Sequence, residues 1–339
     1  MILIVMITGV SLGMLLNINQ VIDYAKAADM LGIHSIWIPE SWGRDAFTTL
    51  GYLTSITSKA MLGTCIVSIY SRSAASIAMA VATLDMLSNG RAILGLGASS
   101  KRLAEEWHGN IFNMNIERMK EYVEAIRLVC KGEKVNYTGS IVKIKDMRLG
   151  FKPLRSSIPI YIAATNRRML NLASSIGDGV ILFLRPLTEL KNTVTMIKSI
   201  NPSCTVCYVV VTAVADDALR AINRAKSTIA FYTAVGPIYA NFLANNGFKD
   251  EVYSIRSSYA SNGLKDLHIH VSDRMLSELA IAGNMDDCVK QYRRFMSSGI
   301  DMLIIQYNPI EYYSNRNDDS DKDKNLKLYT ELLENIKYS

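Results

Sequence analysis

Short runs of aliphatic and β-branched residues alternate with longer segments along most of this 339-residue chain, and no other feature constrains the fold as strongly. In the longer segments, apolar residues recur at spacings of three and four, which is typical of helices that bury one face. The short runs are apolar throughout, as in parallel strands covered by helices on both faces. The pattern therefore predicts parallel strands joined by crossover helices.

Eight strands are expected, each followed by a helix. The strands are predicted at Ile2–Thr8, Ser35–Ile38, Met61–Ile69, Ala92–Leu96, Ile158–Ala163, Gly179–Leu184, Thr205–Ala213 and Met302–Gln306. The helices are predicted at Asn19–Leu31, Thr48–Ser58, Ala75–Leu87, Ile116–Cys130, Arg167–Ser175, Leu187–Ser199, Asp216–Ala234 and Asp286–Ser298, with a last helix at Asn325–Ile336. This alternation predicts an α/β fold, a (β/α)8 TIM barrel, and we expect one barrel domain over residues 1–339.

Two stretches interrupt the alternation. Lys134–Leu149 predicts a hairpin that turns at Thr138–Gly139, whereas Gly236–Asn284 is polar, helical and irregular in pattern. We expect both, at about 134–149 and 236–284, to be insertions at the C-terminal mouth of the barrel. The segment Ser314–Lys324, which holds an acidic run, is expected to be a solvated linker into the last helix.

Composition and charge argue against a disordered protein, a nucleic-acid-binding protein and a membrane-spanning protein. The chain is 49% hydrophobic and 20% charged, so it can bury a large core. Its formal charge of +6 comes from 37 basic and 31 acidic residues that are mostly interleaved, with no long basic block for nucleic acid. No window of about 18 uninterrupted apolar residues offers a membrane span. The expected partner is a small molecule.

The five cysteines fit a reducing compartment, so a cytoplasmic location is expected. An odd number of cysteines spread through a long chain argues against a disulfide framework. Cys204 and Cys207 form a lone CxxC pair with no histidine nearby, and no other spacing is typical of a metal site. The apolar start, Met1–Leu16, has no basic residue before Lys26, which favours a buried strand over a signal peptide.

Residues that follow the strands carry the functional information, because the active site of a barrel lies at the carboxyl ends of its strands. Pro39–Asp45, after the second strand, contains two carboxylates, an arginine and a tryptophan. Trp42 could form the wall of a site for a planar ring, and Arg44 with Asp45 could pair or contact a substrate. An ion pair on the rim beneath a packed tryptophan explains the same residues.

The third and fourth strands mix small residues into apolar runs. Cys65 has apolar neighbours and no histidine near it in sequence, which favours a packed thiol over a nucleophile. Gly95 and Gly97 lie in the fourth strand without a third glycine or an acidic partner, which argues against a dinucleotide-binding motif. Small residues here would let the backbone approach a flat ligand closely.

Several segments together resemble the bacterial luciferase-like superfamily. Leu84–Ser100, which follows Leu62–Arg72, is similar to the pattern "tLd.LS.GR..LG.G" of that superfamily. The resemblance extends to Arg118–Tyr122, Ile158–Ala164, Gly177–Val180 and Ala282–Asp287. Within the superfamily, the chain resembles the branch that uses the deazaflavin coenzyme F420, and in that branch the methylenetetrahydromethanopterin reductases.

This resemblance implies a barrel that holds coenzyme F420, or FMN as in other members, at its C-terminal mouth, usually as a homodimer. It implies that Thr64, Cys65 and Ile66 form a bulge against one face of the deazaflavin, often through a non-prolyl cis peptide bond. Ser99 and Ser100 would lie along the ring edge.

The resemblance also implies a phosphate site at the N-terminus of a helix. Ala164, Thr165, Asn166 and Arg167 would receive the phosphate of the cofactor, because free N–H groups and the helix dipole favour an anion there. Arg185, after the sixth strand, would add a charge-assisted contact.

A deazaflavin transfers a hydride at its C5, so the protein mainly supplies orientation, a dry face and one proton donor. Glu40 and Asp45 are the candidate catalytic residues. Glu40 is preferred because it follows the second strand, where related enzymes place an acid or a histidine. Glu105, Glu106 and His108 are further candidates, although they also fit the polar start of a helix.

Two departures from the reductase pattern concern the ligands. The phosphate turn is Ala164–Arg167 instead of a Gly-Gln-Gly-Pro type, and Met1–Gly9 lacks the acidic residue of strand one that would suit a pterin. Pterin recognition is therefore unsupported. Three hypotheses stay open: an F420-dependent oxidoreductase, an FMN-dependent monooxygenase of the same superfamily, and a non-catalytic relative.

Overall fold

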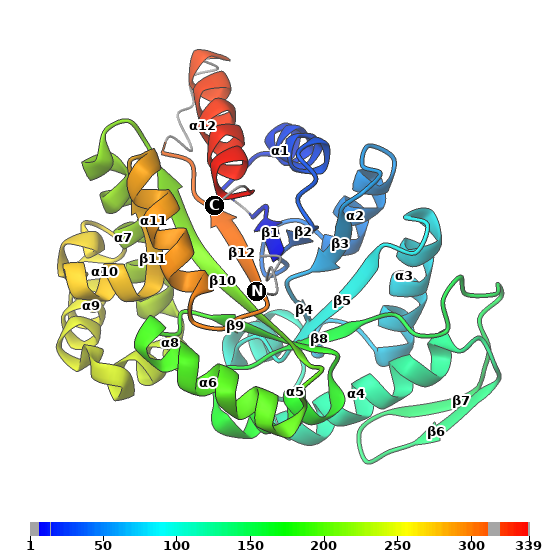
Figure 1. Cartoon of the computed structure of the whole chain (residues 1–339). Coiled ribbons are helices and arrows are strands. Elements are labelled where there is room, and N and C mark those ends of the chain that lie inside the picture. Colours follow the sequence, from blue (N-terminus) through cyan, green and yellow to red (C-terminus); the bar gives the residue numbers. More distant parts are fainter. Residues whose placement is uncertain (1–6, 14, 311–318, 338–339) are drawn as a thin grey trace. The chain divides into compact units, whose positions relative to one another are not determined.

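The structure is a computed structural model that describes residues 7–13, 15–310 and 319–337 (Figure 1). Its internal contacts divide the chain into two compact units. Unit 1 comprises Met1–Ile33, Leu182–Met196 and Val206–Ser339, and unit 2 comprises His34–Ile181 and Ile197–Thr205. Both units contain parallel strands joined by helices.

Unit 2 carries the strands that follow the first helix of the chain. Its parallel strands are β2 (Ser35–Ile38), β3 (Met61–Thr64), β4 (Val67–Ser68), β5 (Ala92–Gly97), β8 (Ile160–Ala163) and the start of β9 (Gly179–Phe183). Its helices are α2 (Ala46–Thr54), α3 (Ala74–Leu87), the π-helical turn η1 (Leu103–Trp107), α4 (Asn115–Cys130) and α5 (Arg167–Ile176). Strand β2 pairs in parallel with β3, β3 with β5, β5 with β8, and β8 with β9.

Unit 1 holds β1 (Ile7–Ser11), most of β10 (Thr205–Val214), β11 (Ala280–Gly283) and β12 (Met302–Tyr307). Its helical elements are α1 (Ile18–Met30), most of α6 (Leu187–Ile200), α7 (Ala218–Val235), α8 (Pro237–Leu243), η2 (Ala244–Phe248), α9 (Lys249–Asn262), η3 (Leu267–His270), α10 (Asp273–Leu279), α11 (Met285–Met296) and α12 (Asp319–Lys337). Strand β12 pairs in parallel with both β1 and β10, and β10 pairs with β11 (Figure 1).

The predicted (β/α)8 fold is confirmed. Within the described residues, the eight expected strands are present as β1, β2, β3, β5, β8, β9, β10 and β12, with helices between them. Strand β2 has its predicted bounds, and its buried Trp37 faces Gly63 of β3 in the register. A Cβ atom at position 63 would lie 2.3 Å from the indole ring, so glycine is needed there for Trp37 to pack.

Two strand predictions are corrected. Strand β1 spans Ile7–Ser11 instead of Ile2–Thr8, because the buried strand continues through Gly9; residues 2–6 lie outside the described residues. The third predicted strand, Met61–Ile69, is divided into β3 and β4 by Cys65 and Ile66, whose peptide bond is cis. Sequence patterning could not show this break, since every residue of the run suits a strand.

The predicted hairpin is present, but not at the mouth of the barrel. Its strands β6 (Val135–Thr138) and β7 (Lys143–Met147) are antiparallel, and Gly139 N donates to Val142 O at 2.8 Å across the turn. The hairpin follows the end of α4 and precedes the start of β8, so it lies at the amino-terminal ends of the strands. The insertion at 134–149 is therefore not a lid over the carboxyl ends.

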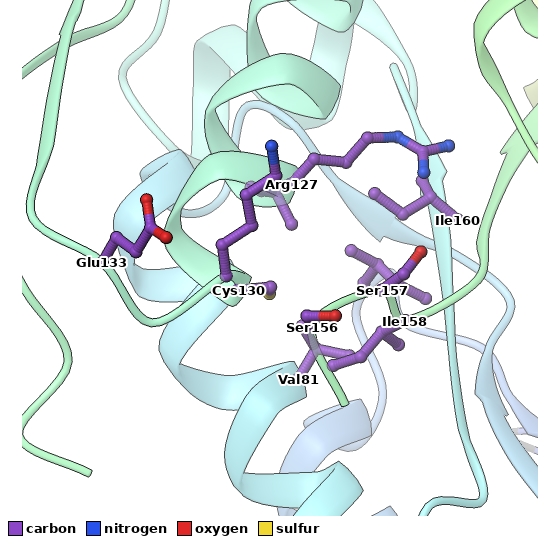
Figure 2. A pocket seen from close by; sticks show the side chains of 11 residues that line it. Val81, Arg127, Cys130, Glu133, Ser156, Ser157, Ile158 and Ile160 are labelled. Carbon is purple, nitrogen blue, oxygen red and sulfur yellow. The ribbon is translucent and has the colours of Figure 1, made fainter. Parts of the chain in front are cut away.

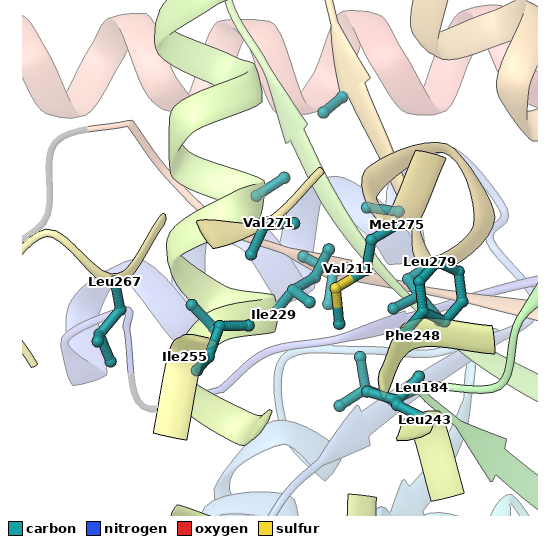
Figure 3. Packing of buried hydrophobic residues seen from close by; sticks show 14 of the residues in the cluster. Leu184, Val211, Ile229, Leu243, Phe248, Ile255, Leu267, Val271, Met275 and Leu279 are labelled. Carbon is teal, nitrogen blue, oxygen red and sulfur yellow. The ribbon is translucent and has the colours of Figure 1, made fainter. Parts of the chain in front are cut away.

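The second insertion, 236–284, is ordered around one apolar core and not irregular (Figure 3). Side chains from α8, η2, α9, η3 and α10 pack there against α7 and β10. The core includes Val211 of β10 and Ile229 of α7, together with Leu243, Phe248, Ile255, Leu267, Val271, Met275 and Leu279. The insertion also contains β11, which was not predicted. Leu184, just after β9, joins this core, so the insertion packs at the carboxyl end of that strand, as expected.

The last helix begins earlier than predicted. Helix α12 starts at Asp319 instead of Asn325, so the expected linker Ser314–Lys324 is corrected from residue 319 onward, and residues 314–318 lie outside the described residues. Acidic residues are favourable in the first turn of a helix, which is why the acidic run is compatible with helix. Among the helices of the described residues, none is long and apolar enough to cross a membrane.

Candidate functional site

A polar cleft in unit 2 lies at the carboxyl ends of β2, β4 and β5. Its volume is about 290 Å³. Its lining consists of Glu40, Ser41, Gly43, Arg44, Asp45, Ser68, Ser71, Arg72, Ser99, Leu103 and His108. Three of the predicted site residues, Glu40, Asp45 and Ser99, are therefore brought together, although they come from separate strand ends. This is the arrangement that a barrel active site requires.

Arg72 links the two predicted carboxylates. Its guanidinium donates to both oxygens of Glu40, at 3.0 Å for Nη2 to Oε2, and also to Oδ2 of Asp45. Oε2 of Glu40 accepts a further hydrogen bond of 2.9 Å from the N–H of Ala46. The side chain of Glu40 is 14% exposed and that of Arg72 21% exposed, so water screens the pair only weakly.

Asp45 also begins a helix. It is the N-cap of α2 and accepts a hydrogen bond of 2.7 Å from Thr48 N. Burial raises the pKa of the Asp45 carboxyl, but the Thr48 hydrogen bonds and the charge of Arg72 outweigh burial and lower the pKa below its usual value. The hydrogen bond to Glu40 raises the pKa of Arg72, which therefore stays charged. Asp45 thus fixes both the start of α2 and the position of Arg72.

The turn that carries Arg72 is held by α4. Tyr122 donates its hydroxyl to the carbonyl oxygen of Arg72 at 3.0 Å. Arg118 stacks its guanidinium over the ring of Tyr70, 4.6 Å from the centroid, and the Tyr70 hydroxyl donates to Asn113 O at 2.6 Å. The Arg118–Tyr122 segment that supports the family resemblance therefore positions the Arg72 turn.

The predicted bulge is present at the carboxyl end of β3. Thr64, Cys65 and Ile66 form it, and Cys65–Ile66 is the non-prolyl cis peptide bond that the resemblance implied. The hydroxyl of Thr64 donates to Gly95 O at 2.8 Å and accepts from Gly95 N at 2.9 Å. A Cβ atom at position 95 would lie 1.9 Å from Thr64 O, so the bulge requires glycine there.

Gly97 has a similar role, because a Cβ atom there would lie 2.5 Å from the Ile66 side chain. The glycine pair of β5 is thus explained by the close approach of the bulge. Cys65 is partly buried, and desolvation raises the pKa of its thiol to about 12. This agrees with the predicted packed thiol, since so little thiolate forms near neutral pH.

Ser99 and Ser100 follow β5 directly. Ser99 lines the cleft with a φ of +59°, a left-handed conformation that is costly for a residue other than glycine. Ser100 accepts a hydrogen bond of 3.3 Å from Leu103 N through its hydroxyl. A left-handed conformation such as that of Ser99 is retained mainly where the surrounding structure or a function requires it.

The π-helical turn η1 contains the other acidic candidates. Glu105 accepts from Phe112 N at 3.3 Å, and Glu106 accepts from Arg102 Nε at 3.0 Å, so both have local partners. Of the further candidates Glu105, Glu106 and His108, only His108, which directly follows η1, lines the cleft. Trp42 and Trp107 pack edge to face with centroids 6.4 Å apart.

The predicted phosphate turn starts α5. Asn166 is the N-cap and accepts from Met169 N at 3.0 Å through its side chain, while Ala164 is buried with its N–H bonded to Ile181 O. Arg167 and its neighbour Arg168 are exposed in the first turn of the helix. Two cations and a helix N-terminus together suit an anion, although the turn lacks the glycines and proline of the reductases.

Arg185 lies in unit 1, after β9, and is only 4% exposed. It stacks over the ring of Phe242 at 4.2 Å and donates to Thr193 Oγ1 at 3.1 Å. Desolvation lowers the pKa of its guanidinium to about 10. Its contact with a phosphate stays a prediction.

The sequence interpretation did not include Arg72, Ser68 or Ser71 among the site residues, although they line the cleft. Ser71 and Arg72 follow the third predicted strand and Ser68 lies near its end, and this position was the available signal. In the part of the chain that the structure describes, no three His, Cys, Asp or Glu side chains lie together in a way that could hold a metal ion.

These features define a class: a (β/α)8 barrel with a polar cleft and a bulged strand at the carboxyl ends of its strands. Residues 4–302 match the family described as luciferase-like monooxygenase. The chain belongs to this luciferase-like family. The match runs through both units.

Named relatives are similar over most of the chain. A 5,10-methylenetetrahydromethanopterin reductase of Archaeoglobus fulgidus is 30% identical over 295 residues, which cover 83% of this chain and 87% of the relative. A putative coenzyme F420-dependent oxidoreductase of Mycobacterium tuberculosis is 27% identical, covering 84% of this chain and 89% of that protein.

A solved structure of the coenzyme F420-dependent tetrahydromethanopterin reductase from Methanopyrus kandleri superimposes with a TM-score of 0.81. The two chains are 22% identical, and the superposition covers 96% of this chain and 97% of the other. At that identity, the likeness shows the fold alone, and it confirms the barrel.

Proposed function

We propose that the protein is an F420-dependent oxidoreductase that transfers a hydride between the deazaflavin C5 and a small organic substrate. The observation that carries this proposal is the bulge at Thr64–Ile66, at the carboxyl end of β3. Gly95 of β5 packs behind the bulge and hydrogen-bonds to Thr64. A bulge presents backbone in place of long side chains, which suits the close approach of a flat ring. The similarity to the putative coenzyme F420-dependent oxidoreductase of Mycobacterium tuberculosis supports the choice of cofactor.

The residues present fit the cofactor. The ring would contact Thr64, Cys65 and Ile66, with Ser99 and Ser100 at its edge. The first turn of α5 supplies N–H groups and the exposed cations Arg167 and Arg168 for a phosphate, and Ala164, Thr165 and Asn166 lead into that turn. We propose Arg185 as a further phosphate contact.

When bound, a deazaflavin exchanges a hydride with a substrate carbon at its C5. Glu40 accepts every hydrogen bond it makes in the structure, from Arg72 and from Ala46 N. Such an acceptor suits oxidation of the substrate, in which the substrate loses a proton as well as a hydride. We therefore assign proton exchange to Glu40, and to Asp45 the task of holding Arg72 against it. His108 faces the same cleft as a second polar contact.

The charged residues of the site favour one class of substrate over another. In the described part of unit 2, both carboxylates of the cleft already bind Arg72. Met1–Gly9, which includes the first predicted strand, contains no acidic residue that could pair with a pterin. A small alcohol, or the corresponding carbonyl compound, needs only a group that exchanges its proton, which is Glu40, and a hydrogen-bond donor for its oxygen, which is Arg72. We propose this class over a pterin.

The test is the reduction of F420 by a panel of small alcohols under anaerobic conditions. The reaction is monitored through the loss of deazaflavin absorbance. The proposal expects turnover with at least one alcohol, and turnover about 100-fold slower or more in the Glu40→Gln variant. Turnover with methylenetetrahydromethanopterin and with no alcohol would overturn the substrate class, but it would leave F420 chemistry intact.

The proposal includes a homodimer in the cytoplasm. Its support is the outer face of α3, where Met79, Met86 and Leu87 are 45–60% exposed although the opposite face of this helix is buried. A helix that is apolar on both faces is typical of one covered in an assembly. Light scattering after size-exclusion chromatography tests it, and a monomer at micromolar concentration would contradict it.

A further inference from the structure

Unit 2 contains a second cavity, of about 380 Å³, that the proposed reaction does not use (Figure 2). It lies between α3, α4, β5 and the segment that leads into β8. Its lining consists of Val81, Leu94, Ile126, Arg127, Cys130, Lys131, Glu133, Ser156, Ser157, Ile158 and Ile160. None of these residues lines the polar cleft.

The two sites lie toward opposite ends of the same strands. Ile158 and Ile160 precede or begin β8, whereas the phosphate turn at Ala164 follows it. The end of α4 and the residues after it, Cys130 to Glu133, lead toward the amino-terminal side of β8. A ligand in this cavity is therefore separate from any ligand at the carboxyl ends of the strands.

The inner part of the cavity is aliphatic. Val81, Leu94, Ile126, Ile158 and Ile160 are each at most 4% exposed, and all of them line the cavity. An apolar cavity of about 150 Å³ is enough to hold benzene, so this one has room for a longer aliphatic body. Burying such a body there is favourable because it removes apolar surface from water.

The outer part is polar and contains two cations, of which Arg127 is neutralised by Asp178. Arg127 donates to Asp178 Oδ2 and to Ile176 O, both at 3.0 Å, so it already has partners. In contrast, the side chains of Lys131, Ser156 and Ser157 make no hydrogen bond or ion pair within the described ranges of the chain. Glu133 is the only carboxylate among the lining residues, against two cations.

We propose that this cavity binds an organic acid with a medium-length aliphatic chain. The carboxylate binds Lys131 at the rim with help from the hydroxyls of Ser156 and Ser157, and the chain packs on Leu94, Ile126 and the other aliphatic side chains. Pockets of this size, apolar with a few convergent polar groups, are typical of small-molecule sites. The proposal does not depend on the cofactor or on the reaction.

Calorimetric titration of the purified full-length protein with octanoate tests the proposal. Acetate lacks the aliphatic body and octan-1-ol lacks the charge, so each should bind at least about tenfold more weakly than octanoate. Lys131→Met should weaken octanoate binding roughly 10- to 100-fold, because a hydrogen bond to a charged group is lost. Lys120→Met, an exposed lysine on α4 outside the cavity, is the matched control and should leave binding unchanged.

A second measurement places the ligand without any substitution. Octanoate should slow the alkylation of Cys130 by iodoacetamide at pH 9, measured by peptide mass spectrometry, while Cys204 and Cys288, which lie outside the cavity, keep their rates. Absence of octanoate binding at millimolar concentration, equal binding to the Lys131→Met variant, or an unchanged rate at Cys130 would each overturn the proposal.

Discussion

Arg72, which follows β4, donates through both terminal nitrogens of its guanidinium to the carboxylate of Glu40, which follows β2. This pair connects two strand ends that are 32 residues apart in the chain. Because the same guanidinium also reaches Asp45, one cation organises both predicted carboxylates. The polar side of the cleft therefore depends on Arg72 as much as on the acids.

The first prediction concerns this pair. Glu40→Gln removes the charge and keeps the shape, so the free energy of unfolding should fall by about 1–2 kcal/mol, the cost of a weakened charge-assisted hydrogen bond. Turnover should fall by about 100-fold or more, with F420 affinity nearly unchanged, since Glu40 serves the substrate side. Steady-state kinetics and fluorescence titration measure the two effects.

Asp45→Asn is the control for that variant. Asparagine is also a good N-cap, so α2 should persist and turnover should fall less than in Glu40→Gln. Equal kinetics for Glu40→Gln and the unsubstituted protein would show that Glu40 has no part in proton exchange.

The second prediction concerns the bulge. Gly95→Ala would place a Cβ atom 1.9 Å from Thr64 O, so the bulge must move, and we expect a loss of about 2 kcal/mol or more in unfolding free energy together with loss of cofactor binding. Gly51→Ala, inside α2, meets nothing within 4 Å and should be neutral or stabilise the fold by about 0.5–1 kcal/mol. Chemical denaturation compares the two variants. Tight cofactor binding by Gly95→Ala would contradict the proposed role of the bulge.

The third prediction separates stability from binding at Ser99. Because its φ is +59°, Ser99→Gly should stabilise the fold by about 0.5–1 kcal/mol. The lost hydroxyl should weaken F420 binding several-fold if it contacts the ring edge. A thermal melt measures the change in stability, and a cofactor titration of the same sample measures the change in affinity for F420. Unchanged affinity would show that Ser99 does not contact the cofactor.

The fourth prediction concerns the hairpin. Glu121 on α4 accepts hydrogen bonds from Ser140 N, Ile141 N and Val142 N at 2.7–2.9 Å and from the Ser140 hydroxyl at 2.6 Å. Burial raises the pKa of the Glu121 carboxyl, but these donors outweigh burial and lower the pKa to about 2.

A lowered pKa in the folded state fixes the direction of the pH effect. The contribution of Glu121 should be complete above its ordinary pKa of 4.5 and should be lost as the pH falls toward 2. Glu121→Gln should cost about 1.5–3 kcal/mol at pH 7 and flatten the acid limb of the stability curve. Hydrogen exchange should show faster opening at residues 139–142, and equal protection in both proteins would refute the account.

The sequence predicted the local elements well and the distant contacts poorly. Strand β2 and the start of α5 were predicted correctly because caps and apolar runs are local signals. Strand β11 was missed because Ala280–Gly283 is short and is recognised only by its pairing with β10.

The same distinction applies to the site. Glu40 and Asp45 follow a strand and were found by that rule, whereas Arg72 acquires its role only through partners 27 and 32 residues away. The break at Cys65 depends on Gly95, which lies on another strand. Interactions of this kind need the folded chain.

The central claim is that the protein uses a deazaflavin. The most direct measurement is an equilibrium titration of the purified protein with F420 and, separately, with FMN, followed by absorbance and fluorescence. The account predicts saturable binding of F420, weakened by Arg167→Glu, and no binding of FMN. Binding of FMN with oxygen consumption would instead indicate a monooxygenase, and binding of neither would indicate a non-catalytic relative; either result would contradict the account.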